Sequence, residues 1–435
     1  MQKQQVDLTS CHSFNEVIEK LKKFANENDT KWIIGNGWDQ NNWPTKKWPT
    51  NKQLNNTFPG HNVVLNRIDG HALMANKRAI LTAKINPDTT IYGGHIEIIN
   101  HELTGIFVDN AMDLILNHVP IPSEETNKKA LITAQNTCFS LGLTTVDIAG
   151  LTKGSVELID KLHNSEELKI KTYIMLTDNE ENFNHYVINL NGPIKTKKMN
   201  VRSFKFFADG SLGSRGACLI NPYLDNQRTH GQLLQNIDTF NTKLNTLKLY
   251  GFQACTHAIG DSANRIITSS YANVLGGSND LRWRIEHVQC ITDKDIEILG
   301  KYNIIPSVQP THATSDFSWA IQRLGIKRLE NCYRYYQLKN QNNLIALGTD
   351  FPVEKINPIH TFYAATFRKN YDDKPLGGFQ PDESLSRVDA LKGMTIWAAI
   401  ANFEENEKGS IEEGKAADLT TVSYTHLTLP TKQMV

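Results

Sequence analysis

Apolar residues along the middle and C-terminal parts of the chain occur in short runs typical of buried strands. Seven such runs are found, at 143–148, 168–176, 201–208, 252–257, 282–287, 304–310 and 343–350. Most are separated by segments in which apolar residues recur with helical spacing, such as 236–251 and 293–303. Strands that alternate with helices predict a parallel sheet. The pattern therefore predicts an α/β protein with seven of the eight strands of a (β/α)₈ barrel.

The first 115 residues have a different pattern. Short alternating runs are interrupted there by Gly, Asn and Pro, which predicts a small α+β unit. The alternation of strands and helices then continues to about residue 404, and after residue 405 short β structure is expected.

Charge and composition give no sign of a nucleic-acid or membrane partner. The 435 residues include 46 Lys and Arg against 46 Asp and Glu. No apolar run approaches the roughly 18 residues that cross a bilayer, and the first residues, MQKQQVDLTSCHSF, lack a signal-peptide pattern. The six cysteines contain no CxxC, which favours free thiols in a reducing, cytoplasmic compartment. Their positions are 11, 138, 218, 255, 290 and 332.

Three of the predicted strands end in a residue that can bind a metal ion. The runs 252–257 and 282–287 end at His257 and His287, and the run 343–350 ends at Asp350. The carboxyl ends of parallel barrel strands lie on one face, where catalytic residues gather. Two imidazoles and a carboxylate there can hold a divalent cation such as zinc.

A lysine inside the apolar run 201–208 needs an explanation. Lys205 lies between Phe204 and Phe206, and lysines are rarely buried without a partner. Desolvation lowers the pKa of a lysine, and the neutral amine can take up carbon dioxide to give a carbamate that bridges two metal ions. The structural alternative is a snorkelling lysine paired with Asp209. The metal-binding residues at matching strand ends favour the carbamate.

Several motifs occur together in a fixed order. The central ones are FKFFADGSLGSRGA, THAIGDSANR, RIEHVQ, SVQPTH and GTDFPVE, with GNGWDQNNWP, LNRIDGHALMAN and GGHIE upstream and GSIEEGKAADL downstream. Over roughly residues 30 to 420 they resemble the amidohydrolase superfamily, specifically its amidohydrolase-3 or YtcJ-like branch, which includes N-substituted formamide deformylases. The resemblance implies a metal-dependent barrel hydrolase. In it Lys205 is the carboxylated bridging lysine, His257 and His287 are metal ligands, and Asp350 is both a ligand and the general base.

The reaction implied is hydrolysis of non-peptide amide bonds in small molecules. Water activated by one or two divalent ions, expected to be zinc, attacks the carbonyl, and Asp350 passes the proton to the leaving nitrogen. Ester or lactone hydrolysis at the same metals, or a non-catalytic barrel, is the alternative. His71, His312 and Arg215 are expected to bind the substrate. For either histidine a structural role is equally expected, and for Arg215 an ion pair with Asp209 is slightly favoured.

The sequence departs from the family pattern at both ends. The family has a His-x-His pair at the end of its first barrel strand, whereas none of the fourteen histidines here has that spacing. We therefore expect a TIM-type barrel lacking its first strand (116–404), an inserted α+β subdomain (1–115) and a remnant of an accessory β-sandwich (405–422). Residues 423–435 resemble a translated sequencing adapter and are expected to be non-native. The chain is interpreted as a fragment with impaired activity, and homo-oligomerisation is left open.

Overall fold

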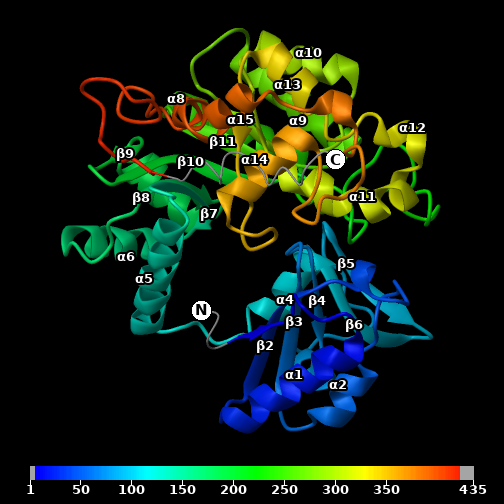
Figure 1. The fold of residues 1–435 in the computed structure, drawn as a ribbon. Helices are drawn as coiled ribbons and strands as arrows, with labels where there is room; N and C mark the ends of the chain where they lie inside the picture. The colour runs from blue at the N-terminus through cyan, green and yellow to red at the C-terminus, as the bar shows by residue number, and fades with distance from the viewer. Residues whose placement is uncertain (1–4, 422–435) are drawn as a thin grey trace, which may run out of the picture. The chain divides into compact units, whose positions relative to one another are not determined.

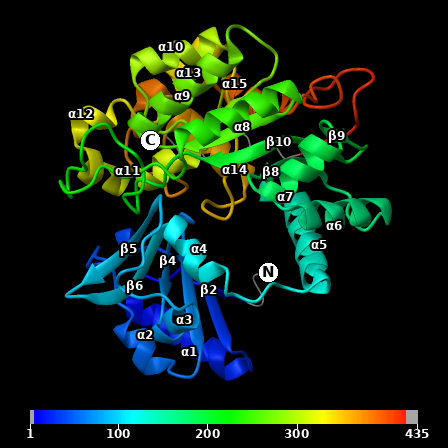
Figure 2. The same cartoon turned by 180° about the vertical axis from the view of Figure 1, so that it is seen from behind.

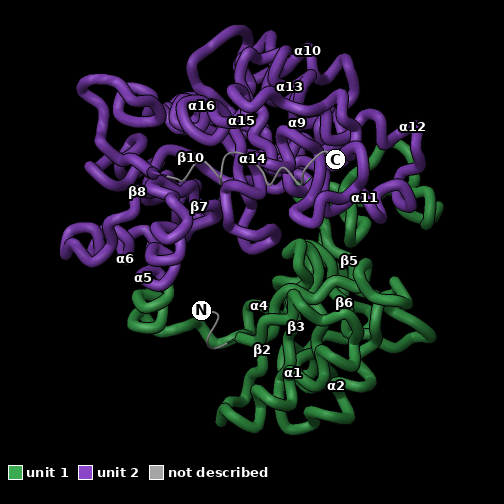
Figure 3. The backbone as a smooth tube through the Cα atoms, viewed as in Figure 1, with its two compact units in different colours: residues 1–130, 209–235 green, residues 131–208, 236–435 purple. Residues whose placement is uncertain are grey.

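The computed structural model describes residues 5–421, which form two compact units. The first unit comprises residues 1–130 and 209–235, and the second comprises residues 131–208 and 236–435 (Figure 3). The first unit is built from two separate pieces of chain. Its second piece, 209–235, is an insertion that begins just after strand β10 (Met199–Phe207) of the second unit. The predicted boundaries at residues 115 and 404 stay predictions.

The second unit contains the parallel sheet that the sequence predicts (Figure 1). All seven predicted runs form strands, and each strand pairs in parallel with its neighbours in the sheet. Their order is β14 (Ala346–Leu347), β13 (Ile305–Val308), β12 (Arg284–His287), β11 (Gln253–Ala258), β10, β8 (Lys171–Thr177) and β7 (Thr145–Leu151). A short strand, β9 (Ile194–Lys195), is antiparallel to β10.

Helices connect most of these strands (Figure 2). The connecting helices include α6 (Lys153–Asn164), α8 (Ile237–Leu249), α9 (Asp261–Leu275), α10 (Asp293–Lys301), α11 (Pro310–Leu324) and α13 (Tyr335–Asn342). Helix α5 (Glu124–Ser140) precedes β7, and α14 (Pro358–Phe367), α15 (Arg387–Met394) and α16 (Ile396–Ala401) follow β14. Helix α8 packs on strand β10, where the ring centroids of Phe240 and Phe206 are 5.3 Å apart. Within residues 5–421, no helix combines the length and the apolar character that crossing a membrane requires.

An ion pair across the inner face shows that the parallel sheet is curled. Arg284 of β12 donates from Nη1 to Asp147 Oδ2 of β7 at 3.0 Å, although three strands separate β12 from β7 in the sheet. Neighbouring strands lie about 4.8 Å apart, so in a flat sheet these two strands would be about 19 Å apart. An arginine side chain cannot span that distance. The seven strands therefore form part of a barrel wall, consistent with the predicted TIM-type fold.

The first unit is built around a sheet of six strands. Their order is β1 (Val6–Asp7), β2 (Trp32–Trp38), β3 (Asn62–Arg67), β4 (Ala72–Ala75), β6 (Glu102–Asp109) and β5 (Gly94–Ile99). Helix α1 (Phe14–Glu27) begins at a serine cap, in which Ser13 Oγ accepts a hydrogen bond from the Glu16 N–H at 3.2 Å. Leu21 of α1 is fully buried and belongs to one apolar core with Trp38.

The segment after residue 404 differs from the prediction. Residues 405–421 form turns and extended chain without a strand, so the predicted short β structure is absent from that described stretch. Its charged side chains pair with other parts of the second unit instead, as Glu405 does with Arg282 at 2.9 Å. A strand needs a partner strand for its backbone groups, whereas the backbone hydrogen bonds of this segment close local turns, as the Ala416 N–H does on the Glu407 carbonyl at 2.8 Å. The expected non-native tail, 423–435, lies outside the described residues.

The expectation of six free thiols is wrong for two cysteines. Cys290 and Cys332 form a disulfide across 42 residues of sequence. The sequence spacing does not reveal this pair, because the backbone pairing of residues 289–291 with 331–333 brings the two cysteines together. The other four, Cys11, Cys138, Cys218 and Cys255, are free and buried.

Candidate metal centre

The predicted metal-binding residues lie at or near the carboxyl ends of the parallel strands. His257 is in strand β11, and His287 is the last residue of β12. Asp350 follows the last strand, β14, by three residues. Lys205 lies in β10, paired in register with Cys255 of β11. All four residues belong to the second unit. Their assignment as metal ligands stays a prediction.

The structure brings three potential donor groups especially close together. One ligand atom each of His287, His312 and Asp350 lies within 4.8 Å of the others. His312 Nε2 is 3.6 Å from Asp350 Oδ2. The rings of His287 and His312 stack at 5.6 Å with an interplanar angle of 19°, and His257 meets His287 edge to face at 4.6 Å. The histidines therefore form a continuous row that ends at the aspartate.

The chemistry of this group fits a divalent cation. Burial lowers the pKa of His312 to about 4, so its imidazole is neutral at physiological pH. Its Nε2 is buried without a hydrogen-bond partner among the described residues, which is unusual for a buried polar atom. Neutral imidazoles and a carboxylate are the donors that zinc and similar metals prefer.

Lys205 faces the inside of the sheet. Phe204 and Phe206 point to the other face, where Phe206 meets helix α8, and alternate residues of a strand point to opposite faces. The Lys205 side chain is buried, with Nζ 5.0 Å from the centroid of the Phe207 ring. Burial lowers its pKa, although the negative charges of Glu286 and Asp350 act in the opposite direction. Within residues 5–421 it has no ion-pair partner, contrary to the snorkelling alternative.

The backbone at two candidate ligands is strained. His287 has φ 75° and Asp350 has φ 57°, and Val288 has φ 42°. Positive φ is uncommon outside glycine and is a genuine outlier for a β-branched residue. Such conformations persist only where the surroundings hold them, and they cluster at functional sites. The Tyr333 N–H bonds to the Gln289 carbonyl at 2.7 Å, and the neighbouring disulfide holds the same turn.

Two polar residues near the donor group were not identified from the sequence. Gln309, the residue before helix α11, places Oε1 2.6 Å from His287 Nδ1. Glu354 accepts a hydrogen bond from Ser315 Oγ at 2.5 Å, and burial raises its pKa to about 7. The sequence predicts His312 as a substrate contact or a structural histidine, not as a member of the donor group. Its position in the first turn of a helix that directly follows strand β13 was the signal that it belongs with the strand ends.

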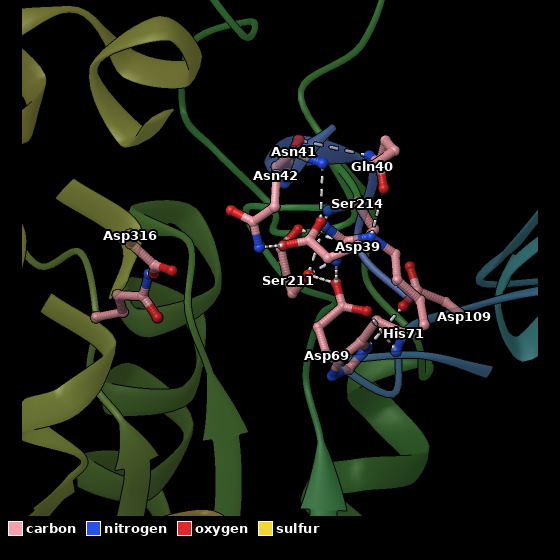
Figure 4. Close-up of polar contacts among 12 residues, drawn as sticks. Asp39, Gln40, Asn41, Asn42, Asp69, His71, Asp109, Ser211, Ser214 and Asp316 are labelled. Carbon is pink, nitrogen blue, oxygen red and sulfur yellow. Dashed lines mark hydrogen bonds and ion pairs between the residues drawn. The ribbon is translucent and has the colours of Figure 1, made fainter. Parts of the chain in front are cut away.

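In the first unit, His71 belongs to a buried network of charges (Figure 4). His71 Nδ1 lies 2.8 Å from Asp109 Oδ1. Burial by itself lowers the pKa of His71, but the bond to Asp109 and the charges of Asp69 and Asp209 raise it above its ordinary value. Arg67, 3% exposed, forms ion pairs with Asp39 and Asp69. The substrate-binding role of His71 stays a prediction.

The segment that follows β10 threads past these charges. A side chain on either Gly210 or Gly216 would collide with the Asp109 carboxylate, so both positions need glycine for close approach. The slightly favoured pairing of Arg215 with Asp209 is wrong, since Arg215 binds Asp225 through two hydrogen bonds of 3.2 and 2.8 Å. Asp209 Oδ2 instead accepts the backbone N–H of Cys218, because the turn folds that amide over its carboxylate. A substrate contact by Arg215 stays a prediction.

Comparison with known proteins finds similarity to amidohydrolases and to a metal-dependent hydrolase. It is 29% identical over 431 residues to the putative amidohydrolase YtcJ of Bacillus subtilis strain 168, covering 96% of this chain and 80% of that protein. It is 23% identical to the N-substituted formamide deformylase of Arthrobacter pascens, and the alignment covers 94% of this chain and 77% of that protein. The structure of an uncharacterized metal-dependent hydrolase from Pyrococcus horikoshii superposes with a TM-score of 0.78 at 25% identity. The superposition covers 99% of this chain and 83% of that one.

The likeness to the Pyrococcus horikoshii structure agrees with the seven-strand wall of the second unit. The model of the amidohydrolase family matches residues 1–435. The resemblance inferred from the motifs is confirmed, and the protein belongs to the amidohydrolase family.

Proposed function

We propose that this protein hydrolyses non-peptide amide bonds of small molecules at a divalent metal centre on the carboxyl edge of the second unit's sheet. The observation that carries this proposal is the convergence of His287, His312 and Asp350, whose ligand atoms lie within 4.8 Å of one another in a family of hydrolases. The formamide deformylase supports carbon–nitrogen bonds as the target.

The centre would be held by residues from neighbouring strands. His257, His287 and Asp350 are the proposed ligands, together with Lys205 as a carbamate, and His312 is either a further ligand or a contact to the substrate carbonyl. A bound cation, expected to be zinc, lowers the pKa of water and polarises the carbonyl group. In the carbamate step the Lys205 nitrogen bonds to the carbon of carbon dioxide and loses one proton. The lowered pKa of buried Lys205 supports this step, because only the neutral amine reacts.

Asp350 is the proposed proton carrier. Its side chain is 39% exposed, so substrate and water can reach it, while His312 Nε2 lies 3.6 Å away. A carboxylate there can accept a proton from water and deliver it to the leaving nitrogen, which must be protonated to depart as an amine. The neutral His312 ring can hold the substrate carbonyl in place.

We further propose that the complete centre uses one more strand. β7 and β14 are the outer strands of the wall, and each pairs on one side only within residues 5–421. A strand between them, carrying two more ligands, would close the barrel. Without it the proposed centre has too few ligands to fix one of two metal ions, and we expect weak activity from the 435-residue chain.

Metal content and amide turnover test the proposal together. We expect the purified protein to bind zinc or manganese, and the His287→Asn variant to lose that metal. His95→Asn, at an exposed position of the first unit, is the matched control. Amine release from N-substituted formamides is compared with hydrolysis of esters and lactones of similar size. Substoichiometric metal after supplementation, or turnover of esters alone, would contradict an amidase.

A further inference from the structure

We propose that Gln309 is a positioning residue that holds the imidazole of His287 in one tautomer, with the lone pair on the nitrogen that faces away from Gln309 as the ligand atom of the candidate metal group. The role in metal binding rests on the proposed function, whereas the hydrogen bond between Gln309 and His287 is observed independently of it. It gives a role in the site to a residue outside the proposed ligand set.

The contact between the two side chains is short and enclosed. His287 Nδ1 and Gln309 Oε1 are 2.6 Å apart, and the residues are 7% exposed each. With the amide oxygen facing the ring, the contact calls for a proton on Nδ1, because an amide oxygen only accepts a hydrogen bond. In that tautomer of a neutral ring the lone pair lies on Nε2. A histidine that binds a metal through one nitrogen commonly has its other nitrogen fixed in this way.

Gln309 is itself held from its backbone. It is the residue immediately before helix α11, and its carbonyl accepts hydrogen bonds from the His312 N–H at 3.0 Å and the Tyr335 hydroxyl at 3.2 Å. The side chain therefore starts from a fixed point. The same residue also sets the start of the helix that carries His312, whose ring stacks on His287 at 5.6 Å.

The need for such a support follows from the backbone of His287. With φ at 75° the residue ends strand β12 in a conformation that non-glycine residues rarely adopt. Such a conformation persists only where surrounding contacts hold it, and the bond to Gln309 is the contact that fixes the ring itself. Gln309 follows directly after β13, the neighbour of β12 in the sheet. The hydrogen bond between Gln309 and His287 therefore also links the end of β12 to the β13–α11 connection.

Two substitutions separate this role from simple packing. Gln309→Met keeps the size and removes the acceptor, whereas Gln309→Glu keeps an acceptor oxygen. Gln135→Met is the matched control, because Gln135 is also buried in the second unit and its oxygen accepts a backbone hydrogen bond, at 3.1 Å from the N–H of Ile170. Histidine tautomers are read by nitrogen NMR in metal-free protein, with the His287 signals assigned by their loss in His287→Asn. Zinc affinity is measured by competition with a chelator.

We expect the Nδ1–H tautomer at His287 in the wild type and in Gln309→Glu, and a mixture of tautomers in Gln309→Met. Zinc affinity should fall by about 10- to 100-fold in Gln309→Met, should recover in Gln309→Glu, and should stay unchanged in Gln135→Met. An unchanged tautomer in Gln309→Met overturns the inference, as does equal loss of zinc in Gln135→Met. If the wild type binds no zinc, the proposed function fails, and the tautomer measurement still decides the role of Gln309.

Discussion

Breaking the disulfide between Cys290 and Cys332 should destabilise the second unit strongly. The two cysteines are 42 residues apart, so the bond closes a large loop in the unfolded chain. For a loop of about 43 residues, the chain-entropy relation gives about 13 cal/mol/K, or about 4 kcal/mol at 25 °C. Reduction adds two electrons and two protons from a dithiol and yields two free thiols. Because both cysteines are buried, we expect the reduced protein to keep its fold with a lower free energy of unfolding.

Urea unfolding with and without a dithiol measures this difference. The double variant Cys290→Ala/Cys332→Ala should match the reduced wild type and should not respond to the dithiol. Cys138→Ala is the control, since Cys138 is a buried free thiol and its loss should leave the response to reductant intact. Equal free energies of unfolding for oxidised and reduced wild type would refute the reasoning and would restore the expectation of six free thiols.

Three other predictions concern charged groups. Lys205→Met should fold as the wild type does, because burial already disfavours the charged amine. Elemental analysis should show that this variant has lost its bound metal. Full metal content in the variant would contradict the carbamate. The pKa of His71 is raised, so its pairing with Asp109 stabilises most below pH about 6.5 and fades as pH rises through the folded pKa. The drop in melting temperature in Asp109→Asn should therefore be larger at low pH than at high pH, and a pH-independent drop would exclude this pairing. Burial raises the pKa of Glu354 to about 7, so the stability of the wild type should fall as pH rises from the unfolded pKa through 7. The Glu354→Gln variant should therefore have a higher melting temperature than the wild type only at alkaline pH. Equal melting temperatures at every pH would show that Glu354 is not held as a neutral acid.

The parallel wall was predictable because local pattern and burial agree there. Each of the seven runs is short and apolar, and in-sequence neighbours pair in the sheet. Lys205 stood out because its two neighbours are phenylalanines that pack outward, and one polar residue in such a run must face inward. His257 and His287 could be placed for a similar reason, since parallel strands all end on one edge.

Other features depend on contacts between distant parts of the sequence, which local pattern does not report. The disulfide joins two loops whose approach is set by backbone pairing 42 residues apart. Gln309 reads as an ordinary polar residue at a helix start, and only the position of His287 gives it a role. Arg215 has two acidic residues near it in the sequence, and the fold pairs it with Asp225, while Asp209 accepts the Cys218 N–H. The sequence therefore indicates which residues are unusual, while their partners emerge from the fold.

The glycines after strand β10 have a consequence for protein engineering. Glycine is required at positions 210 and 216 because the Asp109 carboxylate of the first unit leaves no room for a side chain there. The strand that precedes them does not impose this requirement. A graft that exchanges only residues 1–130 with those of a relative would leave 209–235 fitted to the wrong surface. The two pieces must travel together as one cassette, with the joints placed after β10 and before α8. Chimeras cut in this way retain Lys205 on its own strand and vary only the unit attached to it.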